Sequence, residues 1–293
     1  MSFCFDVKEE LCKIEDKDDA CKLAELYGMI LFAQAVKEDH VKVSTENVLV
    51  INRLQTLSAK LLGVFFEMNE AGVTYNATMK GEALARLYHL LHIENSLEII
   101  ERMIHSNKLF AAFLRGAVLS GGYFNDPINR YHFELVTSNY STAKSALEIF
   151  NNRKIPVKMV VRRANYVVYL KDSQQIYDLL YRLGARNAAF ELMNVKIEKE
   201  TNNNNNRMDN CVAYNMDKAL NKAVEQVRAI EQICNTVGLS ALPDDLLYVA
   251  VLRRENPTSS LNELAALCEG RLSKPSLSRK LNKIVEFAKT LEG

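Results

Sequence analysis

The sequence is poor in the patterns that build metal sites, disulfide frameworks and membrane spans. Its six cysteines include no Cys-x-x-Cys pair and its five histidines are scattered, so the ligand spacing of a zinc site is absent. No apolar run approaches the roughly 20 residues of a membrane-spanning helix, and the first residues lack the pattern of a secretory signal. We therefore expect a cytoplasmic protein with reduced cysteines, no membrane partner and no metal or other cofactor.

The charge balance shows no broad excess of either sign. The 293 residues include 37 Lys and Arg and 36 Asp and Glu, which gives a formal net charge of +1. This excludes a uniformly basic nucleic-acid-binding surface but leaves room for a local basic patch. Hydrophobic residues make up 48% of the chain, enough for a large core, and the length predicts about two domains.

Two helix-sized stretches carry small residues on one side. In residues 113–122, Gly116 and Ser120 lie one helical turn apart, and two further glycines follow. A weaker copy, residues 26–34, contains Gly28. Small residues at such positions let another backbone approach closely. We predict that the two helices pack against each other and that the Gly-Gly pair ends the second one.

The same order of predicted elements follows each small-faced helix. An alternating strand comes first, then a helix capped by asparagine, a β-hairpin and a closing helix. A short amphipathic helix, 3–14, precedes the first copy. The predicted strands are 41–45 and 131–135, the caps are Asn47 and Asn139, the hairpin turns are 69–72 and 163–165, and the closing helices are 81–92 and 173–183.

Equivalent positions in the two copies are separated by nearly constant offsets. Asn47 matches Asn139 at 92 residues (139 minus 47), Gly28 matches Gly116 at 88 (116 minus 28), and Gly72 matches Asn165 at 93 (165 minus 72). The offsets predict two α-β-β-α-β-β-α repeats, at about 21–92 and 109–186, in an α+β domain over residues 1–198. The repeats should pair about a pseudo-twofold axis. Two unrelated α+β stretches are the alternative.

Residues 199–212 break this pattern. Five consecutive asparagines, 202–206, favour a loop because their short amide side chains compete for backbone hydrogen bonds. We predict an Asn-rich linker here. An uninformative mobile tract is the plain interpretation, but Asn206, Arg207 and Asn210 belong to a more specific pattern.

Residues 213–293 predict an all-α domain. Apolar residues recur every three or four positions from Met216 to Cys234, which indicates a long helix that ends at Gly238. A second helix begins at Pro243. Two short helices follow.

The first short helix has a capping box at Ser260–Glu263 and ends at Gly270. Its apolar positions are Leu261, Leu264, Ala265 and Leu267. The second short helix is capped by Ser273, and its inward positions are Leu277, Leu281, Ile284, Val285 and Ala288.

Two short helices with a tight turn and a basic second helix are typical of a helix-turn-helix, which we place at about 259–291. The stretch from Arg271 to Lys283 contains five basic residues and no acidic one. Cations can contact phosphates, hydroxyls can reach phosphates or base edges, and an asparagine can read adenine. A solvated basic face on a helical bundle is the alternative. The predicted DNA-binding residues are Arg271, Ser273, Lys274, Ser276, Ser278, Arg279, Lys280, Asn282 and Lys283.

The paired small-faced helices with this strand order resemble the LAGLIDADG homing-endonuclease fold. In that fold each central helix delivers one acid near its end, and the two acids hold divalent metal for phosphodiester hydrolysis. Alignment on the motif glycines puts these positions at Ala33 and Gly121, neither of which can bind a metal. Nearby Asp39 and Asp126 lie beyond the helix ends, where turn residues are expected. The resemblance therefore implies a catalytically inactive domain and no enzyme activity.

Over essentially the whole chain, the order of parts resembles the bacterial WhiA family. An inactive LAGLIDADG domain is followed by a linker and a C-terminal helix-turn-helix. The sequence departs from the family pattern in its extra asparagines and in the cysteine pair expected before each central helix, which is reduced to Cys21 in the first copy and lost in the second. A redox or metal role for those cysteines is not supported. The residues that carry the resemblance are Asn206, Arg207, Asn210, Cys211, Ala213, Asn215, Lys218 and the stretch 272–277.

The resemblance implies a non-enzymatic regulator that binds double-stranded DNA and acts in transcription, cell division and chromosome segregation, and in sporulation where it occurs. It places the protein on the nucleoid, with Asn206, Arg207 and Asn210 near the DNA. Partners of the sigma-factor type or other regulators stay open, and so does the ligand of the N-terminal domain, which could be DNA, protein or a small effector. The rivals are an architectural or protein-interaction factor with weak DNA binding and, less favoured, an active LAGLIDADG endonuclease.

Overall fold

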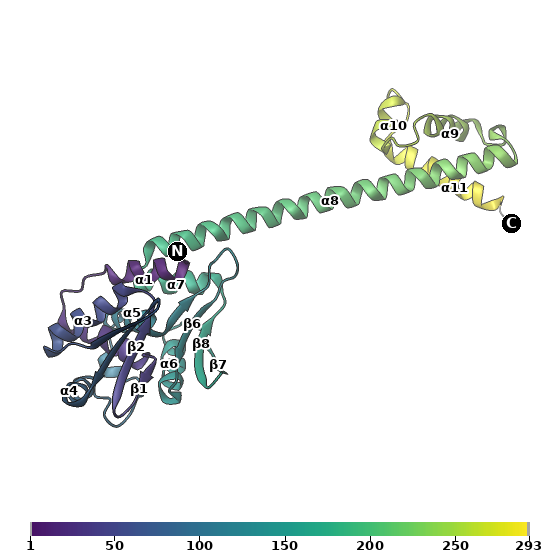
Figure 1. Ribbon diagram of the computed structural model, residues 1–293. Coiled ribbons are helices and arrows are strands. Elements are labelled where there is room, and N and C mark those ends of the chain that lie inside the picture. The colour runs from purple at the N-terminus through teal and green to yellow at the C-terminus, as the bar shows by residue number, and fades with distance from the viewer. Residues whose placement is uncertain (1, 292–293) are drawn as a thin grey trace. The chain divides into compact units, whose positions relative to one another are not determined.

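Both predicted copies of the α-β-β-α-β-β-α repeat are present in the computed structural model, which describes residues 2–291 (Figure 1). Residue 1 and residues 292–293, at the edges of the predicted domains, lie outside the described residues. The presence of both copies confirms the predicted α+β fold of the N-terminal region. The first copy comprises α2 (Asp19–Leu31), β1 (Ala35–Val36), β2 (His40–Thr45), α3 (Val48–Leu62), β3 (Glu67–Ala71), β4 (Thr74–Lys80) and α4 (Gly81–Leu91). The second comprises α5 (Asn107–Gly121), β5 (Gly122–Phe124), β6 (Phe133–Thr137), α6 (Tyr140–Asn152), β7 (Lys158–Arg162), β8 (Asn165–Leu170) and α7 (Ser173–Leu183).

Each copy folds its strands into one antiparallel four-stranded sheet, and the strand order is the same in both. The orders are β1-β2-β4-β3 and β5-β6-β8-β7. Alternate residues of the central strands, such as Val43 opposite Ala77 and Leu135 opposite Val168, are fully buried against the helices. This is the period of two that a sheet with one covered face requires. The short 3-10 helix η1 (Glu101–Met103) lies in the connection between the copies.

The helices α2 and α5 pack along their small faces at the centre of the N-terminal core, as predicted. A Cβ built on Gly28 would lie 2.0 Å from the Phe113 carbonyl oxygen, and one built on Gly116 would lie 1.9 Å from the Glu25 carbonyl oxygen. Both distances are far below contact, so no larger residue fits. Each glycine meets the residue three positions before the other glycine. This reciprocal contact is what a pseudo-twofold axis between the two helices produces.

The predicted helix ends are mostly confirmed. The Asn47 side chain accepts a hydrogen bond from the Leu49 N–H at 2.9 Å, and Asn139 accepts one from the Ser141 N–H at 3.0 Å. The helix α7 ends at Gly184, whose φ of 93° is left-handed. The predicted N-terminal helix is α1 (Phe3–Cys12).

The first hairpin turn is displaced from its predicted place at 69–72. Residues 69–71 belong to β3, and the turn consists of Gly72 and Val73, with Ala71 paired to Thr74. A left-handed residue at the first turn position suits the twist of a hairpin, and Gly72 has a φ of 64°. Gly72, and not the polar residues before it, therefore fixes the register of the β3–β4 hairpin. The second turn, Arg163-Ala164, falls within its predicted range.

The prediction of a loop at 199–212 is wrong, because these residues lie inside one long helix, α8 (Arg186–Thr236). Every side chain from 200 to 222 is exposed. Asparagine costs a helix less than about 0.7 kcal/mol per residue relative to alanine, and a helix that is already nucleated gains one hydrogen bond with each added residue. Helix extension from the packed ends of α8 therefore outweighs the local loop preference of the asparagines.

The chain divides into two compact units, Met1–Lys199 and Glu200–Gly293, each with its own hydrophobic core. In the C-terminal unit, the end of α8 packs with the elements that follow it. These are η2 (Leu239–Ala241), α9 (Asp244–Glu255), α10 (Leu261–Leu267) and α11 (Lys274–Thr290). Over the described residues, no helix is both long and apolar enough to cross a membrane.

Candidate nucleic-acid interface

The candidate interface is built on α10, the turn after it, and α11. The predicted capping box opens α10: the Ser260 N–H donates to the Glu263 carboxylate at 2.6 Å, and the Glu263 N–H donates to the Ser260 hydroxyl at 3.3 Å. The first of these bonds lowers the pKa of Glu263. Leu264 is fully buried, but Leu267 is 51% exposed, which corrects its predicted inward position. Cys268, one helical turn after Leu264, takes the inward place instead.

A buried arginine fixes the connection that leads into α10. Arg253 is only 2% exposed, and its Nη1 donates to the Ser259 carbonyl at 2.6 Å and to the Asn256 carbonyl at 3.2 Å. Burial lowers the pKa of this guanidinium. These bonds hold the loop between α9 and α10 in one conformation. The sequence pattern did not reveal this role, because the partners are backbone carbonyls.

The turn between α10 and α11 leaves the Ser273 hydroxyl without a capping role. Glu269 and Gly270 have φ of 49° and 80°, and the Arg271 N–H donates to the Cys268 carbonyl at 2.9 Å. Ser273 occupies the N-cap position of α11, as predicted, but its side chain makes no capping hydrogen bond. Pro275 removes one of the N–H groups that an N-cap side chain would reach.

The predicted DNA-binding residues of α11 lie on its outer face. The opposite face buries Leu277, Leu281, Ile284 and Ala288 in the core of the C-terminal unit. Ser276 and Ser278 are half-buried. Six of the predicted residues are exposed, and these are Arg271, Ser273, Lys274, Arg279, Asn282 and Lys283.

Lys280 differs from the other predicted cations. Its Nζ donates to the Asp245 carboxylate at the start of α9, and its side chain is 21% exposed. The bond lowers the pKa of Asp245, so the acid stays ionised. Lys280 therefore ties α11 to α9, and part of its charge is already neutralised. Sequence reasoning missed Asp245, which lies 35 residues away (280 minus 245).

The linker residues Asn206, Arg207 and Asn210 lie on the exposed part of α8. Within residues 2–291, the hydrogen bonds and ion pairs of α11 with other elements involve Gln232, Asp245 and Glu225 and none of these three residues. The structure thus groups the helix-turn-helix residues on α11 and the turn before it, and leaves the three linker residues on the exposed part of α8.

Comparison with known proteins covers both units of the chain. A family model described as the WhiA LAGLIDADG-like domain matches residues 110–202, and one described as the WhiA C-terminal HTH domain matches residues 205–288. A relative from Ruminiclostridium cellulolyticum is 31% identical over 99% of this chain and 98% of its own length. One from Thermoanaerobacter pseudethanolicus is 33% identical over 100% and 98%. Both carry the name "Probable cell division protein WhiA".

The chain belongs to the WhiA family. The crystal structure of full-length DUF199/WhiA from Thermotoga maritima is similar in fold, with a TM-score of 0.59 and 27% identity over 99% of this chain and 98% of that one. The arrangement of two repeats followed by a helical C-terminal region is therefore that of the WhiA family.

In this WhiA-family chain, the positions that the resemblance assigned to the endonuclease acids are closed by packing. Ala33, just after α2, is 3% exposed. At the end of α5, a Cβ on Gly121 would lie 2.6 Å from the Val136 carbonyl oxygen and 2.9 Å from the Phe32 carbonyl oxygen. Asp126 accepts a hydrogen bond from the Ile128 N–H at 2.8 Å, as a turn residue does. Within residues 2–291, no three His, Cys, Asp or Glu side chains are grouped so as to hold a metal ion.

Proposed function

We propose that this protein binds double-stranded DNA through α11 and acts as a regulator of transcription. The observation that carries the proposal is the polar outer face of α11, which presents Lys274, Arg279 and Lys283 opposite an apolar face buried in the core. A helix in this setting can enter a major groove with its N-terminal end towards the bases. The match to the WhiA C-terminal HTH domain supports the same assignment.

The roles of the residues follow from their exposure. Lys274, Arg279 and Lys283 contact phosphates, which positions the protein without reading sequence. Asn282, with the hydroxyls of Ser276 and Ser278, lies nearest the base edges. Arg271 and Ser273 in the turn reach the backbone beside the groove, while Lys280 holds α11 on α9 and contributes less to DNA than its charge alone implies.

The cellular role follows from the family. The names of the relatives support a role in cell division, and we extend this to chromosome segregation, and to sporulation in lineages that sporulate. The protein is cytoplasmic and associated with the nucleoid. Regulators or sigma-factor-type proteins are its candidate protein partners, and Asn206, Arg207 and Asn210 of α8 are candidate secondary contacts to DNA.

The N-terminal unit has no enzymatic role in this proposal. A side chain at Gly121 would overlap two backbone carbonyls, and Ala33 has no metal ligand to offer. The closed packing at Gly121 supports a structural axis in place of a nuclease centre. A magnesium-dependent plasmid-nicking assay is expected to show no cleavage by the intact protein.

A salt titration of DNA binding tests the role of α11. The double variant Arg279→Ala/Lys283→Ala is expected to bind duplex DNA more weakly and to lower the slope of log K against log salt by about one to two units, because two phosphate contacts are lost. Fluorescence anisotropy with a labelled promoter duplex measures both quantities.

The matched control is Lys289→Ala, which removes an exposed cation from the far end of the same helix. It should leave affinity and slope nearly unchanged. If the double variant binds with the wild-type affinity and slope, α11 is not the DNA-binding helix.

A further inference from the structure

The N-terminal unit contains a cavity of about 580 Å³ that the DNA-binding proposal does not use. Its walls come from the segment just after α1, the start of α2, and α3. Five basic side chains line it: Lys13, Lys17, Lys22, Arg53 and Lys60. Only two acids line it, so the lining has a formal charge of +3 in a protein whose whole chain carries +1. Such a local excess of positive charge marks a place for anions.

Arg53, which lines this cavity, is held rigidly by a buried acid. Its Nε and Nη2 donate to the two oxygens of Glu25 at 2.8 and 2.9 Å, and Glu25 is 0% exposed. Arg115 of α5 donates to the same carboxylate at 2.8 Å. The Arg53 side chain is 12% exposed, and its Nη1 donates to no partner among the described residues. A guanidinium fixed in this way offers a donor at little entropic cost.

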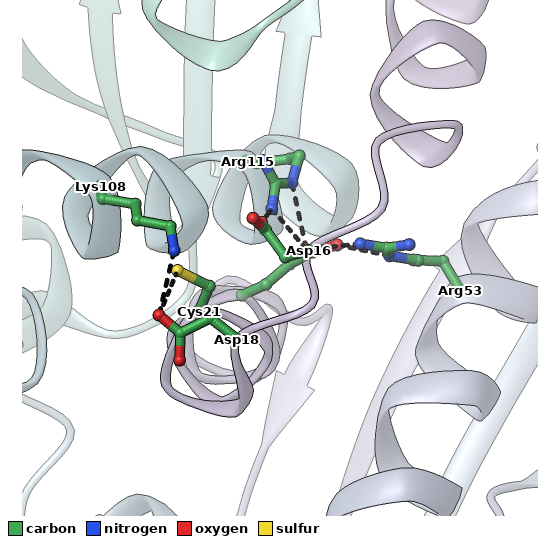
Figure 2. A network of polar contacts seen from close by, with 7 residues as sticks. Asp16, Asp18, Cys21, Arg53, Lys108 and Arg115 are labelled. Carbon is green, nitrogen blue, oxygen red and sulfur yellow. Dashed lines mark hydrogen bonds and ion pairs between the residues drawn. The ribbon is translucent and has the colours of Figure 1, made fainter.

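Acids around the cavity neutralise part of its positive charge: Lys13 pairs with Glu9 at 2.8 Å, as Arg53 does with Glu25. The two acids of the lining face away from Lys17 and Lys60 or lie at the rim. The Asp16 carboxylate is engaged by Arg115 on the side of the α2–α5 pair (Figure 2). Glu15 is exposed at the rim. Lys22 is positioned by Asp19 at 2.6 Å and is 17% exposed, whereas Lys17 and Lys60 make no ion pair within residues 2–291. Two lysines are thus free to turn towards an anion beside Arg53.

The cavity also has an apolar side. Leu49 is half-buried in the lining, and Leu57, which is only 2% exposed, belongs to the core behind it. Ligand pockets of roughly 300–1,000 Å³ commonly combine such apolar walls with a few placed polar groups. A bare inorganic anion would leave this wall uncovered. The lining therefore fits a molecule with an anionic end and a compact, less polar body.

We propose that this cavity binds a phosphate-bearing small molecule of about mononucleotide size. The phosphate groups lie against Arg53, Lys17 and Lys60, and the body of the ligand packs on Leu49. Arg53 recognises phosphate oxygens through its free Nη1, while Glu25 holds it in place.

Isothermal titration of the full-length protein at low salt tests the site with ATP, AMP, inorganic phosphate and adenosine. The affinity is expected to fall in that order, with no binding of adenosine, because both the charge and the body of the ligand contribute. Absence of binding by ATP and AMP overturns the proposal. Binding of adenosine as tight as that of ATP also overturns it, because phosphate would then have no role.

Charge reversal at the rim locates the binding. Lys60→Glu is expected to weaken ATP binding about tenfold, as expected for reversing one charge beside a phosphate in a partly screened site. Lys144→Glu makes the same change on α6, at an exposed lysine outside the cavity lining, and should leave the affinity unchanged. Equal effects of the two variants overturn the assignment to this cavity. Both residues are exposed, so the fold is preserved, and circular dichroism verifies this.

The phosphates that these cations bind could also belong to duplex DNA. A competition experiment distinguishes DNA from a small phosphate-bearing ligand. ATP is expected to bind the protein equally well when it is saturated with a promoter duplex, because the site is a hollow on the N-terminal unit. Complete displacement of ATP by the duplex overturns the proposal and assigns these cations to a DNA surface. The titrations without DNA test the cavity whether or not α11 binds DNA.

Discussion

Glu134 shows how one buried acid can make the stability of the N-terminal unit depend on pH. The His132 Nε2 lies 2.6 Å from its carboxylate, and Arg162 donates to both of its oxygens at 2.9 and 3.1 Å. Burial acts to raise the pKa of Glu134, but the hydrogen bonds from His132 and Arg162 outweigh it and lower the pKa below the ordinary 4.5. A depressed pKa means that the contribution of Glu134 to stability is present above the unfolded-state pKa and is lost as the pH falls through the folded-state pKa.

Glu134→Gln should therefore destabilise the N-terminal unit at neutral pH and matter little at acid pH. The glutamine keeps the shape but loses the charge that Arg162 pairs with. Urea denaturation at pH 7, and at a pH low enough to protonate the folded-state carboxyl, measures the difference in unfolding free energy between variant and wild type. Glu148→Gln, at an exposed glutamate of α6, is the control and should leave the midpoint unchanged. A gap of equal size at both pH values would show that the charge of Glu134 is not responsible.

At the scale of helices and strands, the close contact of α2 and α5 restricts the residues that the sequence can carry at two positions. The contact requires glycine at 28 and 116, because a Cβ at either position would overlap a backbone carbonyl of the other helix. Relief of this overlap means moving two helices that lie at the centre of the core. We expect Gly116→Ala to cost more than about 3 kcal/mol of unfolding free energy, at the upper end for overpacking of a core.

The comparison is Gly81→Ala, which adds the same methyl group where a Cβ would meet nothing within 4 Å. Its only cost is the φ of 62°, about 1 kcal/mol. Chemical denaturation followed by circular dichroism measures both variants. Equal losses would mean that the central helices can separate without penalty.

The elements that could be predicted from the sequence are those whose signals are local. Asn47 and Asn139 form their caps with N–H groups two or three residues away, and the capping box of α10 spans Ser260 to Glu263. The repeat was visible because both copies keep the same order and spacing. The asparagines of 202–206 gave a wrong prediction, since a local preference for loop was overruled by helix extension from both packed ends of α8.

Over the whole molecule, the parts that sequence reasoning missed depend on contacts between distant residues. Lys280 was predicted to face DNA along with its neighbours, but Asp245 holds it. The basic cavity around Arg53 gathers side chains from α2, α3 and the segment after α1, and no motif marks it. The outer face of α11 was predictable, because helical periodicity alone separates its buried leucines from its exposed cations.

The segregation of charge gives a prediction for the whole protein in the cell. With a net charge of +1, the chain has little general attraction for DNA, so the proposed binding would depend on the local patch of α11. Crosslinking and sequencing of bound DNA should give discrete promoter peaks for the intact protein. The peaks should disappear for residues 1–198 alone and weaken strongly for Arg279→Ala/Lys283→Ala, with Lys289→Ala as the control that keeps them. Diffuse signal for the intact protein would favour an architectural role, and peaks retained by residues 1–198 would move DNA recognition to the N-terminal unit.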